Sequence, residues 1–298
     1  MTTTFPMSEG FIPFHGYKTW YRVVGDLTNI APGKFPMLAL HGGPGVPHDS
    51  LEPLEEFART GRPVIFYDQL GCGNSDKPTD DTLWSVNLFL DELSTIRRAL
   101  GLERIHLLGH SWGGALAMEH ALKKPDGFLS LVLASAPASR ADFMEGQRRV
   151  REQLPTEIRL ILEQGWSDNP DYQRAYEYFS SGHVCRIVPS PDFFRRSGEN
   201  MNVHLNVLMW TRELSDFDIR PRLGDIRVPT LITAGRYDGL AVQQEALLHA
   251  GIPDSQMALF EKSSHYAHAE EPERYLSVLD EFLSRVELNL AKMRKEAD

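Results

Sequence analysis

The sequence predicts an α/β fold: a mostly parallel sheet with helices on both faces and an inserted helical cap. Short apolar runs alternate with amphipathic helical patterns along residues 1–138, and this alternation is typical of parallel sheets covered by helices. The alternation stops over residues 139–225 and resumes over residues 226–298. We therefore expect a core built from residues 1–138 and 226–298, with residues 139–225 forming the cap.

Six short segments predict the strands of the core sheet. Each is rich in apolar residues, is too short for a typical helix and is bounded by glycine, proline or polar residues. They are residues 36–42 (PMLALHG), 63–69 (PVIFYDQ), 105–110 (IHLLGH), 129–136 (LSLVLASA), 229–236 (PTLITAGR) and 256–261 (QMALFE).

Two amphipathic patterns predict helices of the core. Residues 88–102 repeat leucine and isoleucine at helical spacing, and Gly101 marks the end of this helix. Residues 272–288 show the same periodicity and begin with Pro272, a residue favoured at the first helical position. We expect the charged residues 292–298 (KMRKEAD) to form a frayed tail.

The predicted cap lacks strand patterns. It is rich in arginine, glutamate and aromatic residues, and proline and glycine interrupt its helical patterns. Its aromatic side chains are candidates for an apolar acyl pocket, or for the core of the cap itself. They include Trp166, Tyr172, Tyr176, Phe193, Phe194 and Trp210.

Composition and charge limit the classes of function. The 298 residues, 42% of them hydrophobic, are enough to bury one large core. The formal net charge is −10 and no dense run of lysine and arginine occurs, so we expect no nucleic-acid partner. No segment approaches the roughly 18 apolar residues of a membrane span, so we expect no membrane partner either.

The two cysteines, Cys72 and Cys185, do not make a disulfide framework, and neither has partners at zinc-site spacing. A reducing compartment and the absence of a signal-peptide pattern lead us to expect a cytoplasmic protein.

The GCG segment at 71–73 is similar to the start of a dinucleotide-binding motif, but Asp76 stands where the third glycine is needed. We expect Cys72 to be a small packing residue.

The segment GHSWGG at 109–114 predicts a nucleophile. It follows a predicted strand and precedes a helical pattern, so Ser111 sits on a tight strand-to-helix turn that requires small neighbours such as Gly109 and Gly113. Such a turn exposes the serine hydroxyl. The helix that begins at Trp112 also directs its free N–H groups toward a developing oxyanion.

A second loop predicts the other half of an oxyanion hole. HGGPG at 41–45 ends an earlier strand, and its glycines allow a backbone N–H group to approach a ligand closely. We expect the N–H groups of Gly43 and Trp112 to bind the oxyanion together.

A serine nucleophile needs a histidine base and a carboxylate that orients it, in the chain order serine, aspartate or glutamate, histidine. Asp238 follows one predicted strand and His265 follows another, so both should lie at the edge of the sheet that holds Ser111. Among the 11 histidines, His268 is the nearest competitor, but it falls at the closing helix. His265, His268 and Glu270 form no complete ligand set, so we expect no metal site.

At these residues the chain resembles the proline iminopeptidase family of α/β-hydrolases, which includes tricorn-associated aminopeptidases and amino-acid amidases. The resemblance covers most of the core and extends into the cap. The segments that carry it are HGGPG (41–45), DQLGCGNSDKP (68–78), GHSWGG (109–114), DNPDYQRAYEYF (168–179), GRYD (235–238) and SSH (263–265).

The resemblance implies an α/β-hydrolase fold and a serine aminopeptidase. Such an enzyme releases an N-terminal residue, proline or another small apolar one, from peptides, amides or arylamides through an acyl-enzyme. Ser111, His265 and Asp238 would be its triad. No metal or organic cofactor is implied, and the partner is a small peptide, amide or ester substrate.

The resemblance also nominates Glu213 as a ligand for the substrate's ammonium group, because MWTREL (209–214) is similar to the family's cap segment M-x-G-P-x-E-F after a shift of one residue. The family often places a second carboxylate after the triad aspartate, but this chain has Gly239 there. The loss of one charge-assisted hydrogen bond weakens binding by about 1.5 to 3 kcal/mol. Glu177, Glu199 and Glu270 are candidates to compensate.

An esterase, lactonase or amidase that acts on substrates without a free amine is the alternative, because it would use the same triad. A dehalogenase or epoxide hydrolase is disfavoured, because those relatives of the fold carry aspartate where this chain has Ser111. A binding protein on a hydrolase scaffold is disfavoured by the presence of every catalytic element.

Overall fold

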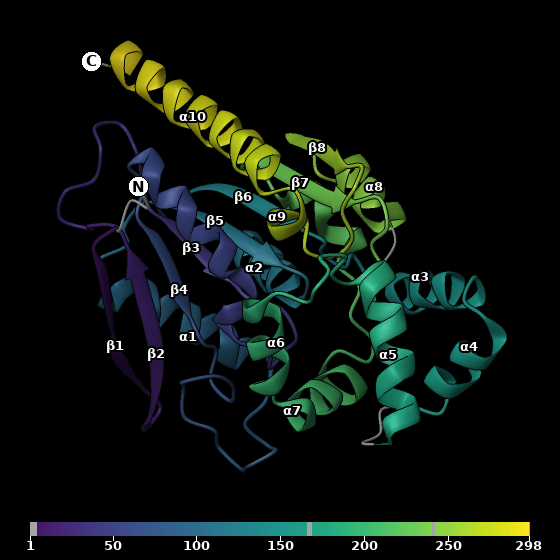
Figure 1. Ribbon diagram of the computed structural model, residues 1–298. Coiled ribbons are helices and arrows are strands. Elements are labelled where there is room, and N and C mark those ends of the chain that lie inside the picture. Colours follow the sequence, from purple (N-terminus) through teal and green to yellow (C-terminus); the bar gives the residue numbers. More distant parts are fainter. Residues whose placement is uncertain (1–4, 166–168, 240–241, 298) are drawn as a thin grey trace.

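The computed structural model describes residues 5–165, 169–239 and 242–297 (Figure 1). Its described strands form one sheet of eight strands in the order β1-β2-β4-β3-β5-β6-β7-β8. The six predicted strands are present and pair in parallel with their neighbours among them, so the prediction of a mostly parallel sheet is confirmed. They are β3 (Met37–Leu40), β4 (Val64–Tyr67), β5 (Ile105–His110), β6 (Phe128–Ala134), β7 (Thr230–Gly235) and β8 (Ser255–Phe260).

Two strands near the N-terminus escaped the sequence analysis. β1 (Met7–Phe14) and β2 (Tyr17–Val24) form an antiparallel hairpin, and β2 pairs antiparallel with β4. β1 contains Gly10 and Pro13, which are unfavourable in a central strand. They are tolerated here because β1 lies at the edge of the sheet.

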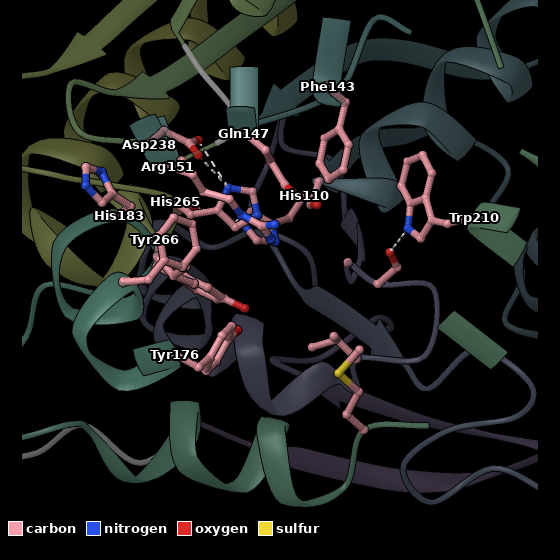
Figure 2. A pocket seen from close by; sticks show the side chains of 18 residues that line it. His110, Phe143, Gln147, Arg151, Tyr176, His183, Trp210, Asp238, His265 and Tyr266 are labelled. Atoms are coloured by element: carbon pink, nitrogen blue, oxygen red, sulfur yellow. Dashed lines mark hydrogen bonds and ion pairs between the residues drawn. The ribbon is translucent and has the colours of Figure 1, made fainter. Parts of the chain in front are cut away.

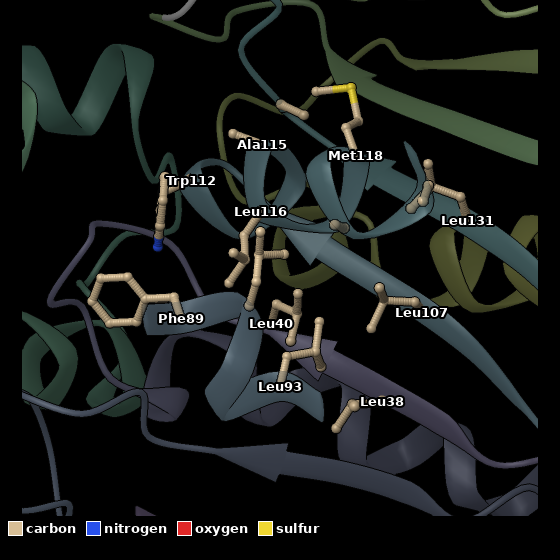
Figure 3. Close-up of a cluster of buried hydrophobic side chains, with 14 of the residues drawn as sticks. Leu38, Leu40, Phe89, Leu93, Leu107, Trp112, Ala115, Leu116, Met118 and Leu131 are labelled. Atoms are coloured by element: carbon tan, nitrogen blue, oxygen red, sulfur yellow. The ribbon is translucent and has the colours of Figure 1, made fainter. Parts of the chain in front are cut away.

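The sheet buries one hydrophobic layer on each face. Alternate residues of β3 point to opposite faces, so Leu38 and Leu40 join one cluster while Met37 and Ala39 join the other. The first cluster, shown in Figure 3, lies under α1 (Val86–Ala99), α2 (Trp112–Leu122) and α8 (Val242–Gly251). The second lies under η1 (His48–Thr60) and α10 (Pro272–Ala297).

Capping explains where the first predicted core helix begins. The hydroxyl of Ser85 accepts a hydrogen bond from the backbone N–H of Leu88, so α1 starts at Val86, two residues before the predicted start.

The prediction of a frayed C-terminal tail was wrong, because α10 continues to Ala297 and residues 292–297 are helical. Lysine, arginine, glutamate and alanine favour the helix intrinsically, and this outweighs the expected fraying.

Helices fill the segment between β6 and β7, and the described residues 140–225 contain no strand. In Figure 1, α3, α4 and α5 lie together below α8. A small apolar cluster around Leu162, Tyr172 and Phe179 holds α4 and α5 together. The elements are α3 (Arg140–Glu152), α4 (Thr156–Glu163), α5 (Pro170–His183), α6 (Asp192–Glu199), α7 (Val203–Leu208), the π-helix η2 (Met209–Glu213) and the 3-10 helix η3 (Arg220–Asp225).

The helices that the structure describes include none that is both long enough and apolar enough to cross a bilayer.

A buried ion network ties α10 to the sheet. The guanidinium of Arg62, just before β4, donates to Glu287 at 2.7 and 2.9 Å and to Asp280 at 2.5 Å. The ring of His106 in β5 lies 3.3 Å from the same Glu287 carboxylate. Burial alone would raise the pKa of Glu287, but the hydrogen bonds from His106 and Arg62 lower it to about 2.

We expect Arg62→Met to lower the free energy of unfolding by about 3 kcal/mol or more, because it removes the strongest partners of a buried carboxylate. Urea denaturation measures the change. Arg59→Met is the matched control, because Arg59 is exposed and lies 3.6 Å from an exposed Glu56; it should cost less than about 1 kcal/mol. Equal effects of the two substitutions would contradict a stabilising role for the network.

Candidate active site

The backbone turns sharply between β5 and α2, and Ser111 lies at the turn. Its φ of 54° and ψ of −121° lie outside the common regions for a residue with a side chain. α2 begins at the next residue, Trp112, so the first N–H groups of the helix, which have no acceptor within it, face the same turn.

Close backbone contacts explain the glycines on both sides of Ser111. A Cβ atom on Gly109 would lie 2.2 Å from the carbonyl oxygen of Gly113, and one on Gly113 would lie 2.3 Å from the carbonyl oxygen of Leu40. Real contacts of Cβ atoms are never so short, so any side chain at either position would push α2 away from β3 and β5. The structure therefore bears out the predicted need for small neighbours.

One cavity of about 230 Å³ brings most of the predicted site residues together (Figure 2). Ser111, Asp238, His265 and Gly43 line it, and its walls are largely apolar and aromatic. The other lining residues are Gly42, Val46, His110, Phe143, Gln147, Arg151, Tyr176, Phe179, His183, Val184, Met201, Trp210, Gly239 and Tyr266.

Asp238 and His265 form a hydrogen-bonded pair. Nδ1 of His265 lies 3.1 Å from both carboxylate oxygens of Asp238, whose side chain is fully buried. The two residues lie in the loops after β7 and β8, at the edge of the sheet where β5 ends in Ser111. No described hydrogen bond joins the Ser111 hydroxyl to His265; such bonds often form only when substrate is bound.

The loop that carries His265 is held from two sides. The carboxylate of Glu270 accepts hydrogen bonds from the N–H and hydroxyl of Ser264 and from the N–H of Tyr266. Nε2 of His110, the residue before the nucleophile, lies 2.9 Å from the carbonyl oxygen of His265. These contacts hold the backbone on both sides of His265 and so position its imidazole ring.

The candidate oxyanion donors lie beside Ser111. Gly43 has a φ of 113°, a conformation that glycine adopts readily, and it lines the cavity. The indole N–H of Trp210 donates a hydrogen bond to the carbonyl oxygen of Gly43 at 2.8 Å. The indole N–H of Trp112 donates to Gln69 at 2.9 Å, which fixes the start of α2. Hydrogen bonds therefore tie both residues to neighbouring segments.

The structure does not bring Glu213 into the cavity. Glu213 is exposed at the end of η2, where its carboxylate accepts a hydrogen bond of 3.0 Å from the N–H of Val86, the first residue of α1. A carboxylate is favourable there because the N-terminus of a helix is positive. Its role as an ammonium ligand stays a prediction that this geometry does not favour, since local similarity of sequence does not fix the direction of a side chain.

No other predicted carboxylate replaces it. Glu177 is exposed on α5, Glu199 pairs with Arg195 at 2.7 Å, and Glu270 is bonded to the His265 loop. Among the described residues that line the cavity, Asp238 is the only one with a carboxylate.

Space beside Gly239 is also filled. A Cβ atom there would lie 3.0 Å from the ring of Phe179 and 3.2 Å from the carbonyl oxygen of His183, both in α5. The N–H of Gly239 donates to that same oxygen at 2.9 Å. The space that a side chain at position 239 would need is therefore occupied by the end of α5.

Glu245 lies in α8, outside the cavity lining, and is buried. Burial, assisted by the negative charge of Asp238, raises the pKa of Glu245 well above its usual range. Burial and the charge of Asp238 therefore both disfavour the charged form of Glu245.

The aromatic residues of the helical segment divide into two groups. Tyr176 and Trp210 line the cavity, and Phe143 stacks on Trp210 with ring centroids 5.0 Å apart. Tyr172 belongs to the small core of α4 and α5, and Phe194 contacts Tyr266. Phe193 lies on α6 outside the cavity lining, and Trp166 lies outside the described residues.

Several lining residues were missed by the sequence analysis. Gln147 and Arg151 lie on α3, and their spacing of four residues is a signal that both face the same way. Met201 and Tyr266 reach the cavity from loops, and no sequence pattern announces them.

A buried group of His41, Asp68 and Cys72 has ligand atoms within 4.8 Å of one another, close enough for a metal ion. Its donors are already used: Nε2 of His41 accepts from the N–H of Gln69, and Asp68 accepts from His48 at 2.8 Å. Burial lowers the pKa of His41 to about 4 and raises the pKa of the Cys72 thiol.

Cys72 is fully buried, and its thiol donates a hydrogen bond to the carbonyl oxygen of Gln69, as expected of a packing residue.

Comparison with known proteins agrees with this geometry. Residues 36–272 match the family described as the alpha/beta hydrolase fold. A proline iminopeptidase of Heyndrickxia coagulans is 35% identical and covers 94% of this chain and 99% of its own. One of Saccharolobus solfataricus is 36% identical over 96% of both chains. The crystal structure of a proline iminopeptidase of Mycobacterium smegmatis superimposes with a TM-score of 0.86 at 35% identity, covering 95% of this chain and all of that one. The chain is therefore a hydrolase and belongs to the proline iminopeptidase family of α/β-hydrolases.

Proposed function

We propose that the protein is a serine aminopeptidase that releases an N-terminal residue, proline or another small apolar one, from peptides, amides or arylamides. The observation that carries this proposal is the convergence of Ser111, the His265–Asp238 pair and Gly43 on one small cavity. The names of the relatives support an N-terminal residue as the acyl group that is transferred to Ser111, while the rest of the substrate leaves as the amine.

In the proposed mechanism, Oγ of Ser111 attacks the substrate carbonyl carbon while Nε2 of His265 takes the hydroxyl proton. Asp238 accepts the hydrogen bond from Nδ1 of His265, which orients the ring and stabilises its positive charge. The N–H groups of Gly43 and Trp112 bind the resulting oxyanion.

The tetrahedral intermediate then collapses. The carbon–nitrogen bond breaks, and His265 returns its proton to the leaving amine. Water, deprotonated by His265, attacks the acyl-enzyme in the same way and releases the acid and the free Ser111 hydroxyl. No metal or organic cofactor takes part in the proposed steps.

We further propose that residues 139–225 act as a cap that shapes the substrate site. Its contacts with the core support this role: Trp210 bonds to Gly43, and His183 bonds to the carbonyl oxygen of Tyr237 beside Asp238.

Two cysteines that are free and buried support a cytoplasmic location.

A second candidate is an amidase or esterase whose substrates lack a free amine. One observation favours it: no carboxylate besides Asp238 lines the described cavity, and α5 fills the space beside Gly239. An ammonium group in a largely apolar cavity is costly without a partner of opposite charge.

We expect Ser111→Ala to abolish turnover and Asp238→Asn to lower kcat by about 10³- to 10⁴-fold, because the imidazole loses its orientation. Steady-state kinetics on a prolyl arylamide measure both, and thermal unfolding verifies that the variants fold. Ser181→Ala, on the exposed face of α5, is the control and should keep full activity. A Ser111→Ala enzyme with more than about one hundredth of the wild-type kcat would overturn the assignment.

We expect prolyl and alanyl arylamides to be cleaved at least about tenfold more efficiently than their N-acetylated forms, judged by kcat/KM. The opposite order would reject the aminopeptidase and favour the second candidate, with the triad unchanged.

Glu213→Gln should leave the ratio of free to acetylated substrates unchanged within about twofold, because Glu213 lies outside the cavity. The same substrate panel measures this ratio. A selective rise of KM for free-amine substrates would restore Glu213 to the ammonium site.

A further inference from the structure

One face of α3 lines the active-site cavity. Phe143, Gln147 and Arg151 follow one another at intervals of four residues and all reach the cavity (Figure 2). Phe143 stacks on Trp210, whose indole bonds to Gly43. A helix rises 1.5 Å per residue, so the backbone of Arg151 lies about 12 Å further along α3 than that of Phe143. The α3 wall therefore changes from aromatic near the oxyanion donors to cationic at its far end.

Arg151 has no acidic partner within the described chain, although its charge interacts with the nearby Tyr172 and Tyr176. Its guanidinium makes no ion pair or hydrogen bond there, and its Nε atom is buried without an acceptor. The acidic residues that share a neighbouring groove with it are engaged elsewhere: Glu152 pairs with Arg148, and Glu163 lies 4.0 Å from Arg159. A buried guanidinium N–H without an acceptor is unfavourable, and a ligand oxygen would satisfy it.

Gln147 supplies a second free donor. Its side-chain amide has no hydrogen-bond partner among the described residues and lines the same cavity one helical turn before Arg151. An arginine fork with an adjacent amide suits a carboxylate, whose two oxygens accept up to four hydrogen bonds.

The position of Arg151 in the helix does not by itself explain this arrangement. A cation in the last turn of α3 stabilises the helix through its dipole, but Arg149 occupies the same turn and does not line the cavity. Arg151 differs from Arg149 in facing the cavity that holds Ser111.

We propose that Arg151 and Gln147 form a carboxylate-binding subsite, and that the enzyme favours acyl groups bearing a carboxylate over their neutral isosteres. The inference rests on the proposed function of Ser111, and it concerns the acyl group rather than the leaving amine. Glutamyl and glutaryl groups are the chemical class expected to benefit.

Two isosteric pairs of arylamides test the proposal. Glutamyl and glutaminyl arylamides carry a free amine, whereas the glutaryl arylamide and its terminal monoamide do not. In the wild type we expect kcat/KM of the charged member to exceed that of the neutral one at least tenfold in one or both pairs. Arg151→Met should reduce this ratio to about one, and Arg151→Lys should keep part of it. Arg149→Met is the control and should leave it unchanged.

A ratio near one in the wild type, or a ratio that Arg151→Met leaves unchanged, would overturn the subsite. If activity is absent for every substrate, including prolyl and alanyl arylamides, the proposed function fails while the subsite is still tested by binding. Calorimetry with glutarate and its monoamide serves this purpose. We expect at least tenfold tighter binding of glutarate to the wild type and to Arg149→Met, and loss of this difference in Arg151→Met. Equal binding of glutarate to all three proteins would reject the subsite independently of catalysis.

Discussion

The close approach of three backbone segments around Ser111 is the constraint on which the rest of the site depends. β3, β5 and α2 meet where only hydrogen atoms fit on Gly109 and Gly113. The strained backbone of Ser111 costs on the order of 1 to 3 kcal/mol, and the packing of α2 against the sheet holds it in place. Trp112, Leu116 and Met118 are almost fully buried in the cluster of Figure 3. The packing of α2 against the sheet therefore stabilises the hydrophobic core and also holds the turn that presents the serine hydroxyl.

Hydrogen bonds from the helical segment 139–225 fix the loops around that turn. The loop before η1 is held by Trp210 at Gly43 and by Asn206 at Pro44, and the loop after β7 is held by His183. Because these bonds join backbone carbonyl groups of the core to side chains of the segment, a shift of the segment would move candidate catalytic groups. The position of the segment and the geometry of the candidate catalytic loops are thus linked through the same contacts.

The charge of the cavity is set by a few residues of this chain. Sequence identity near 35% over almost the whole length shows the family, but the residues that face the acyl group are set locally. Gly239 is packed against α5, and Glu213 bonds to the N-terminus of α1. Arg151 faces the cavity, and the described residues give it no counter-ion. One fold can serve many substrates because the residues that line its site set the specificity.

The sequence by itself determined the sheet strands of the core, the strand-to-helix turn at Ser111 and the order of Ser111, Asp238 and His265. These are local properties, since periodicity, glycine spacing and position at strand ends are written into short segments. It did not reveal β1, whose Gly10 and Pro13 are acceptable only at a sheet edge. Only the tertiary structure decided which side chains of 139–225 reach the cavity, because a helix surface has several faces and packing selects one. That selection turned Glu213 away and brought Gln147 and Arg151 in.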